Sequence, residues 1–368
     1  MANTLFILGA GASKQAGAPL MAEFLDRAGD LLAEGQVTDD STSFQNVFRA
    51  VGRLQPLHSK ADFDMGNVES VFALMEMGKT LEKFPGCDTV DEINGLITNM
   101  KTVITKTIER TLLFPLETAN AGGIEYKRYS EPFPYREFVE LLQYLREEAF
   151  PGHKISVLTF NYDLALDLAL MRDDLGPDYC FTASGSQRKI PLLKLHGSLN
   201  WVRCPECDRV VAWELEDYLN KHYPPSRAKE KAPLFIGSRL SEFPLSCNHS
   251  FRREPAIVPP TWNKEDYHRP LSKVWGRAAQ ELGDSENIFV IGYSMPESDA
   301  FFPHLYALGS VSETPMKRFW VFNPDETGGV KGRFTRLLGP QAQRRFQYFP
   351  ETFDRAIETI RKEFPART

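Results

Sequence analysis

The hydrophobic positions predict strands and helices that alternate over most of the chain. A short apolar run, Thr4 to Leu8, ends at a glycine, and a second run, Lys154 to Phe160, is equally short. Further strands are expected at 192–195, 256–258, 287–293, 318–323 and 346–349, and helices at 20–32, 164–171, 266–282, 300–308, 331–338 and 352–364. Such alternation is typical of an α/β fold whose mainly parallel sheet is covered on both faces.

Residues 38–150 interrupt this alternation. Helical spacing recurs at 68–84, 91–114 and 134–150, and strand signals are few. We therefore expect a large helical insertion or cap within a Rossmann-like α/β domain. The expected division is a catalytic domain of residues 1–37 and 151–368, the insertion at 38–150, and a small lobe at 201–253 inside the catalytic domain.

Composition narrows the classes of protein that the chain can belong to. Its 368 residues carry 43 Lys and Arg against 49 Asp and Glu, so the net charge of −6 gives no global basic footprint of a nucleic-acid binder. Five cysteines are too few for a disulfide scaffold, which favours a reducing cytoplasm. No apolar run is long enough to predict a membrane span, and the N-terminus lacks the features of a signal peptide.

A glycine-rich loop, GAGAS (Gly9 to Ser13), separates the first predicted strand from the first predicted helix. Glycines at this place let the backbone approach a phosphate closely, and the N–H groups of a helix start complement its charge. The dinucleotide fingerprint would need a third glycine where this chain has Lys14. A plain tight turn is the alternative, but the position of the loop favours phosphate binding.

Two polar turns follow the next predicted strands. The turn TFNYD carries Asn161 and Asp163, and the turn HGS carries His196. Ligands of open α/β sheets bind beyond the carboxyl ends of strands, and the pKa of a histidine suits a general base. The alternatives are structural: Asp163 is also a good helix N-cap, and a lone histidine more often has only a structural role.

A group of metal-type residues lies in the lobe at 201–253. Cys204 and Cys207 form a CxxC pair, and Cys247 and His249 follow after 39 intervening residues. Three thiolates and one imidazole complete a tetrahedral zinc site with no open position, which is the structural type. The alternative is that these cysteines are reduced and free. The pattern favours zinc that stabilises a ribbon-like lobe and does no chemistry.

These motifs, in this order, resemble those of the sirtuins. GAGAS with Gly17 and Pro19 is similar to the first sirtuin glycine motif, TFNYD to the asparagine–aspartate motif, and LHGS to the segment of the catalytic histidine. IGYS, with Gly292 and Ser294, resembles the motif that meets the cofactor phosphates. VFNPD, with Asn323, resembles the strand end that contacts the adenosine ribose.

Several features differ from the protein-deacylating sirtuins. Pro19 is followed by Leu-Met-Ala where those enzymes carry Asp-Phe-Arg, and the metal set would end in a histidine. TFNYD, HGSLNW and GYSMPESD look more like the bacterial sirtuin-type NAD hydrolases of anti-phage defence. Those proteins deplete NAD in infected cells, and several are triggered by a sensor or assemble with a HerA-type hexameric ATPase.

The resemblance implies an NAD glycohydrolase that releases nicotinamide and ADP-ribose. Asn161 would hold the ribose and a water, His196 would accept a proton, and Asp163 would support the cationic transition state. The residues expected to bind NAD are Gly9, Ala10, Gly11, Ala12, Ser13, Gly17, Pro19, Thr159, Gly292, Ser294 and Asn323. Glu297 and Asp299 are expected to cap the next helix.

Two other functions are compatible with the same motifs. One is an NAD-dependent protein-lysine deacylase, and the other is a non-catalytic module that senses NAD or ADP-ribose. The presence of both Asn161 and His196 favours an enzyme over a sensor. The resemblance further implies a cytoplasmic homo-oligomer whose partner is a HerA-type ATPase or another defence sensor. No direct contact with nucleic acid or membrane is predicted.

Overall fold

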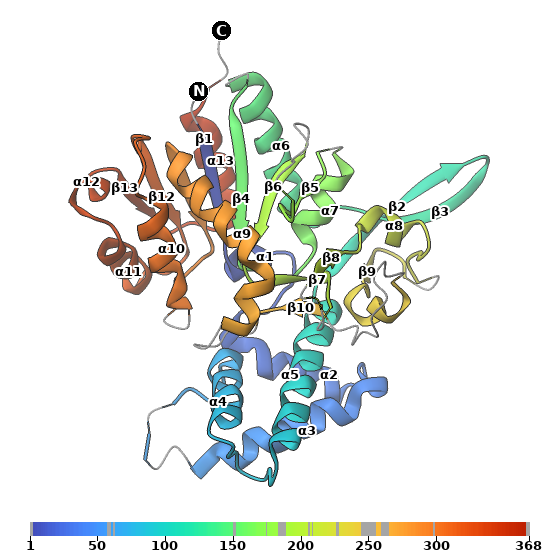
Figure 1. The fold of residues 1–368 in the computed structure, drawn as a ribbon. Coiled ribbons are helices and arrows are strands. Elements are labelled where there is room, and N and C mark those ends of the chain that lie inside the picture. Colours follow the sequence, from blue (N-terminus) through green and yellow to red (C-terminus); the bar gives the residue numbers. More distant parts are fainter. Residues whose placement is uncertain are drawn as a thin grey trace.

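A seven-stranded parallel sheet forms the centre of the computed structural model (Figure 1). The structure describes residues 3–56, 60–61, 63–149, 152–173, 175–182, 189–204, 207, 209–225, 228–243, 255–258, 265–296 and 299–365. The strand order is β13-β12-β11-β1-β4-β6-β5. The strands are β1 (Asn3–Leu8), β4 (Lys154–Thr159), β5 (Pro177–Asp178), β6 (Ile190–Lys194), β11 (Asn287–Ile291), β12 (Arg318–Phe322) and β13 (Phe346–Phe349). The predicted α/β class with a Rossmann-like parallel sheet is confirmed.

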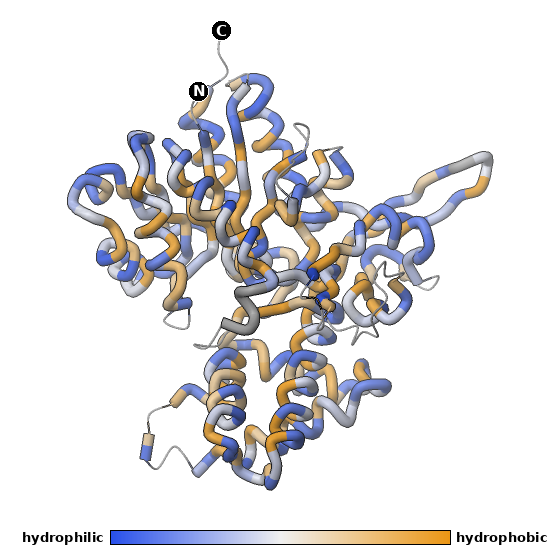
Figure 2. Tube along the Cα trace, viewed as in Figure 1, coloured by the Kyte–Doolittle hydropathy of each residue, from blue (hydrophilic) through white to orange (hydrophobic). Residues whose placement is uncertain are grey.

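The strands at the centre of the sheet are almost wholly apolar because helices cover both of their faces. Figure 1 shows α9 (Glu265–Asp284) in front of the sheet and α6 (Tyr135–Tyr144) and α13 (Phe353–Glu363) behind it. The other helices of the α/β domain are α7 (Ala165–Arg172), α10 (Phe301–Gly309), α11 (Gly329–Leu337) and α12 (Pro340–Gln343). In Figure 2 the strands form an orange centre with bluer helix surfaces outside.

Four helices form a bundle beyond the carboxyl ends of the strands (Figure 1). They are α2 (Phe24–Ala33), α3 (Ser41–Leu54), α4 (Val68–Thr80) and α5 (Val90–Thr111). The central helix α5 packs against the other three and begins with a capping box between Thr89 and Glu92. Since α2 packs with α3 and α5, the bundle begins earlier in the chain than residue 38.

The expectation that residues 38–150 are wholly helical is wrong at 113–129. These residues form an antiparallel hairpin of β2 (Leu113–Ala121) and β3 (Ile124–Tyr129), turned by Gly122 and Gly123 with φ of 60° and 87°. A Gly-Gly pair between two runs is a hairpin signal, because both turn residues need positive φ. The strand β9 (Lys231–Pro233) extends this sheet on the other side of β2. The following helix, α6, packs on α7 and α13.

The segment after His196 forms a second small antiparallel sheet. It contains β7 (Gly197–Arg203), β8 (Val210–Ala212) and β10 (Pro255–Ile257) in the order β10-β7-β8. The helix α8 (Leu215–Leu219) and the 3-10 helix η5 (Gly237–Glu242) complete its described part. None of the described helices is long and apolar enough to cross a membrane.

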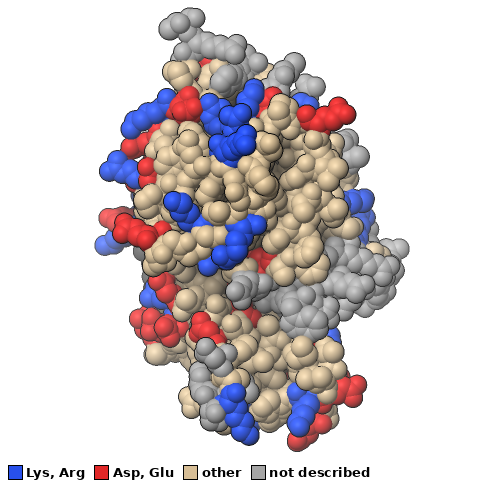
Figure 3. Space-filling view, turned by 90° about the vertical axis from the view of Figure 1, so that its left-hand side faces the viewer, with Lys and Arg blue, Asp and Glu red and all other residues tan. Residues whose placement is uncertain are grey.

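Lys and Arg side chains gather on the face of the molecule seen in Figure 3. A cavity of about 680 Å³ at the amino ends of β12 and β13 is lined by Lys317, Arg318, Arg344, Arg345 and Lys362, among others. Two of these cations are paired, because Lys317 lies 2.8 Å from Glu286 and Arg318 lies 2.6 Å from Glu363. This cavity lies at the end of the sheet opposite to the candidate site described next.

Candidate functional site

A cavity of about 800 Å³ lies between the carboxyl ends of the parallel strands and the helix bundle. The segments that follow β1, β4, β6, β11 and β12 all contribute to its lining. The parallel register explains this convergence: Leu8 pairs with both Thr159 and Ile291, so neighbouring strands end at the same level. The edge used by ligands of open α/β sheets is therefore the edge that carries this cavity.

The cavity brings together ten of the residues predicted for catalysis or NAD binding. They are Ala10, Gly11, Ser13, Pro19, Asn161, Asp163, His196, Gly292, Ser294 and Asn323. Gly9, Ala12, Gly17 and Thr159 are described but do not belong to its lining. Gly17 instead packs closely against the end of α5, since its φ is +106° and an added Cβ would lie 2.9 Å from the carbonyl oxygen of Thr111.

The expectation that GAGAS is a loop is wrong, because Gly9 is the N-cap of a short helix, α1 (Ala10–Lys14), that follows β1 directly. The glycines of this segment allow its backbone to contact the backbone that follows β11. Gly9 N donates to Ile291 O at 3.1 Å, and Gly11 N donates to Gly292 O at 2.9 Å. A Cβ at Gly9 would lie 2.4 Å from the Cα of Tyr293, and one at Gly292, whose φ is +63°, would lie 2.3 Å from Ala12 N. The absence of side chains is thus required by the contact of these segments, independently of any phosphate.

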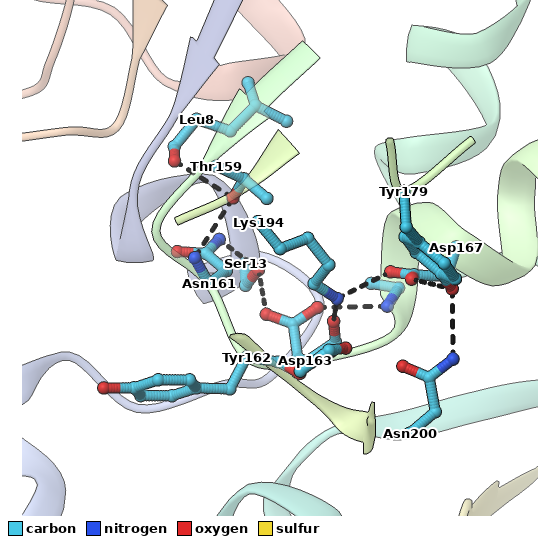
Figure 4. Close-up of polar contacts among 12 residues, drawn as sticks. Leu8, Ser13, Thr159, Asn161, Tyr162, Asp163, Asp167, Tyr179, Lys194 and Asn200 are labelled. Carbon is cyan, nitrogen blue, oxygen red and sulfur yellow. Dashed lines mark hydrogen bonds and ion pairs between the residues drawn. The ribbon is translucent and has the colours of Figure 1, made fainter. Parts of the chain in front are cut away.

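Ser13 joins the GAGAS segment to the TFNYD turn (Figure 4). Its hydroxyl, on a side chain that is 1% exposed, donates to Asp163 Oδ2 at 2.6 Å and lies 2.7 Å from the hydroxyl of Tyr135. Asn161 Nδ2 donates to Ser13 Oγ at 3.0 Å and to Gly9 O at 2.9 Å. The single O–H of Ser13 is committed to Asp163, so Ser13 orders the site as well as lining it.

The interpretation of Asp163 as the N-cap of α7 is wrong, because the N-cap is Leu164 and no side chain accepts a hydrogen bond there. Asp163, one residue earlier, contacts two segments instead. Its Oδ1 accepts from Ala165 N at 3.0 Å in the first turn of α7, while its Oδ2 holds Ser13. Burial raises the pKa of Asp163, although the charge of Lys194 opposes the rise. The carboxyl group therefore supports the turn that presents Asn161.

A buried ion pair lies beneath this turn (Figure 4). Lys194 Nζ donates to the carbonyl oxygen of Asp163 at 2.6 Å and to Asp167 Oδ2 at 2.9 Å. Asp167 Oδ1 accepts from the hydroxyl of Tyr179 at 2.7 Å, and Asn200 Nδ2 donates to that hydroxyl at 3.0 Å. No sequence pattern predicts this network, because its members come from α7, β6, β7 and a loop.

His196 lines the cavity from the end of β6, and the next residue fixes its backbone. Gly197 has φ of +80°, and a Cβ there would lie 1.8 Å from the carbonyl oxygen of Ala256. The carbonyl of His196 accepts from Val258 N at 2.7 Å. The side chain of His196 is 5% exposed, and its ring contacts those of Phe160 and Tyr162, with centroids 5.1 and 6.1 Å away.

The prediction that Asp299 caps the next helix is wrong. The N-cap of α10 is Ala300, and no side chain accepts a hydrogen bond there. Asp299 is buried, and its Oδ1 lies 3.2 Å from His196 Nε2. The capping interpretation failed because α10 begins at Phe301 and Asp299 contacts His196 instead. Glu297, predicted to cap the same helix, lies outside the described residues.

The bundle also contributes polar groups that no motif in the sequence identifies. Asn67 caps α4 by accepting from Glu69 N at 2.9 Å, and both residues line the cavity. The Glu69 side chain is 8% exposed. Burial raises the pKa of Tyr162, and the nearby charges of Glu69 and Asp299 add to that rise. Glu69 therefore brings a buried carboxyl group from the bundle to the lining of the cavity.

The far end of the cavity is formed after β11 and β12. Asn323 Oδ1 accepts from Asp325 N at 3.0 Å, so this side chain shapes the turn that lines the cavity. Arg333, from α11, donates through Nε to Ser294 O at 2.8 Å. Sequence reasoning did not select Arg333 for the site, because its contact with Ser294 joins elements 39 residues apart.

The predicted zinc ligands are described only in part. Cys204 is buried at the end of β7 and Cys207 is exposed, whereas Cys247 and His249 lie outside the described residues. Cys204 N donates to Arg209 O at 2.9 Å and closes the β7–β8 hairpin. The part of the chain that the structure describes contains no group of three His, Cys, Asp or Glu side chains able to hold a metal. Zinc at this lobe stays a prediction.

No protein-family model matches the chain, and no curated protein matches it in sequence. Among solved structures, the chain is similar to a Sir2 homologue in complex with 2′-O-acetyl ADP-ribose, with 14% identity, a TM-score of 0.39, and 100% of this chain and 95% of that chain covered. It is also similar to a Sir2 homologue–NAD complex, with 14% identity, a TM-score of 0.38, and 99% and 91% covered. Similarity of this order assigns no activity, so the chemistry rests on the residues of the cavity.

Proposed function

We propose that the chain is an NAD glycohydrolase that cleaves the bond between nicotinamide and ribose with water. The observation that carries the proposal is that Asn161 and His196 line one cavity at the carboxyl ends of the strands, together with the GAGAS segment and Asn323. An amide and an imidazole at one cavity fit the hydrolysis of a glycosidic bond. The Sir2 homologues with a bound NAD or ADP-ribose derivative are consistent with this choice of ligand.

The orientation of Asn161 supports its role toward ribose and water. Both hydrogens of its Nδ2 have acceptors inside the protein, at Gly9 O and Ser13 Oγ. A ligand would therefore meet Oδ1, which is an acceptor and suits the O–H of a ribose hydroxyl or of a water. The contacts of Ser13 and Asp163 hold the amide in this orientation before any ligand arrives, which is the preorganisation that such catalysis needs.

The reaction needs little acid catalysis, because the nicotinamide of NAD leaves as a neutral base from a cationic pyridinium. The bond from C1′ to the ring nitrogen breaks with its electron pair going to the ring, and a water oxygen bonds to C1′. His196 accepts the proton lost by that water or by a ribose hydroxyl. The carboxyl groups of Glu69 and Asp163, which both line the cavity, stabilise positive charge that develops on the ribose.

The test is to incubate purified protein with NAD and no peptide, and to quantify nicotinamide and ADP-ribose. Asn161→Ala and His196→Ala should each lower the rate by about 10²-fold or more. His304→Ala, which changes an exposed histidine of α10, is the matched control and should leave the rate unchanged. Undiminished hydrolysis in both cavity variants would refute the assigned roles, and release only with an acylated peptide would identify a deacylase.

The proposal includes a biological setting that rests on the resemblance of TFNYD, HGSLNW and GYSMPESD to defence proteins. In that setting the enzyme depletes NAD in phage-infected bacteria. Its trigger is self-assembly or a partner such as a HerA-type ATPase.

A further inference from the structure

A buried carboxylate, that of Asp299, faces the imidazole of the candidate site. Asp299 Oδ1 lies 3.2 Å from His196 Nε2, and the two side chains are 4% and 5% exposed, respectively. A carboxylate removed from water is unfavourable unless it is paired and hydrogen-bonded. Asp299 lies 103 positions after His196 in the chain, so the fold itself brings the two groups together.

Aromatic side chains hold this pair in one geometry. The hydroxyl of Tyr293 donates to Asp299 Oδ2 at 3.1 Å. The ring of Tyr293 stacks on that of Phe160 at 4.2 Å, and the edge of Phe160 packs on His196 at 5.1 Å. Burial and the neighbouring carboxylate raise the pKa of Tyr293, so its hydroxyl stays a donor at neutral pH. Each oxygen of Asp299 thus has a partner that fixes its position.

We propose that Asp299 is the positioning residue of His196. Asp299 accepts the Nε2 proton of the imidazole, and Tyr293 orients the carboxylate from the opposite side. In the neutral imidazole this places the lone pair on Nδ1, which becomes the atom able to accept a proton. When Nδ1 takes a proton, the carboxylate stabilises the imidazolium that forms. The reaction that His196 serves rests on the proposed function, whereas the pairing itself does not.

The electrostatic surroundings of His196 come from several elements. Asp299 and Tyr293 belong to the segment after β11, Tyr162 and Asp163 to the turn after β4, and Glu69 to α4. Of these groups, Asp299 is the one with a direct ion-pair contact to the imidazole. Removal of its charge should therefore change the titration of His196 more than removal of any other charge at the cavity.

The direct test observes His196 without using any activity. Protein labelled with ¹⁵N-histidine is titrated by NMR, and the His196 signals are identified by their loss in His196→Gln. Asp299→Asn should lower the pKa of His196 by about one unit or more, because the neutral amide no longer stabilises the imidazolium. It should also change the populations of the two tautomers. Tyr293→Phe keeps the ring stack and should shift the titration in the same direction by a smaller amount.

The kinetic test separates positioning from a loss of structure. In Asp299→Asn, kcat should fall by about 10²-fold, and the acid limb of its pH profile should move to lower pH by the same interval as the NMR titration. Asp299→Glu, which restores the charge, should recover part of the rate. Asp26→Asn, at an exposed position of α2, is the matched control and should match the wild-type enzyme.

The outcomes distinguish this inference from the proposed function. An unchanged His196 titration in both Asp299→Asn and Tyr293→Phe would overturn the positioning role, even if NAD hydrolysis persists. The expected shift in a protein that does not hydrolyse NAD would support the pairing and would refute the proposed function. If Asp299→Asn does not fold, the titration of Tyr293→Phe decides.

Discussion

Replacement of Lys194 by methionine should destabilise the protein more than replacement of any surface lysine. The side chains of Lys194 and Asp167 are each 1% exposed and lie 2.9 Å apart. Methionine keeps most of the volume but removes the ammonium, which leaves Asp167 as a buried charge with the hydroxyl of Tyr179. Loss of one partner from a buried pair costs about 3–5 kcal/mol, since the remaining charge is uncompensated.

The matched control is Lys317→Met. Lys317 forms an ion pair of nearly the same length, 2.8 Å, with Glu286, but its side chain is 54% exposed. Such a pair contributes about 1 kcal/mol or less. Urea denaturation followed by tryptophan fluorescence at pH 7 gives the free energy of unfolding for both variants.

A double variant tests the mechanism of the loss. In Lys194→Met with Asp167→Asn, the charge that was left unpaired is removed while Tyr179 keeps an acceptor. The double variant should therefore recover at least half of the stability lost in Lys194→Met. If Lys194→Met costs no more than Lys317→Met, or if the double variant is less stable than the single one, the reasoning is refuted.

Two further predictions concern the contacts around the cavity. Gly292→Ala should lower the free energy of unfolding by about 2 kcal/mol or more and lower NAD hydrolysis at least tenfold, because its Cβ would meet Ala12 N at 2.3 Å. The control, Gly52→Ala, has open space around it and should leave stability unchanged or slightly higher. A rate of NAD hydrolysis for Gly292→Ala equal to wild type would contradict the account. Burial raises the pKa of Glu109 from 4.5 to about 7, so the folded state binds this proton more tightly and its contribution to stability, full below pH 4.5, is lost as pH rises through 7. Glu109→Gln should therefore gain about 2–3 kcal/mol of unfolding free energy relative to wild type between pH 5 and pH 8, measured by urea denaturation, and a difference that does not depend on pH would disprove this.

The sheet was predictable because its strands are short apolar runs bounded by turns. The bounds predicted for 346–349 match β13, and those predicted for 154–160 differ from β4 by one residue. The hairpin at 113–129 was missed because β3 is mostly exposed, and its apolar positions are too few to stand out from the helices around it. Its Gly-Gly turn was the available signal.

The candidate site was predictable where one short segment carries its chemistry. Asn161, His196 and Ser294 follow their strands directly, so the order of the elements places them at one edge of the sheet. Asp299 and Glu69 could not be assigned in this way. Their positions depend on how a loop and a helix of the bundle pack over the sheet, and these contacts join segments far apart in the chain.

The central claim is that the protein cleaves NAD with water as the acceptor. The most direct measurement is incubation with NAD in H₂¹⁸O without peptide, with nicotinamide and ADP-ribose quantified by mass spectrometry. The account predicts equal amounts of the two products, one ¹⁸O atom in the ADP-ribose beyond any exchange seen with added ADP-ribose, and loss of both products in His196→Ala. Release of nicotinamide only when an acylated lysine peptide is present, with an O-acyl-ADP-ribose as product, would contradict it.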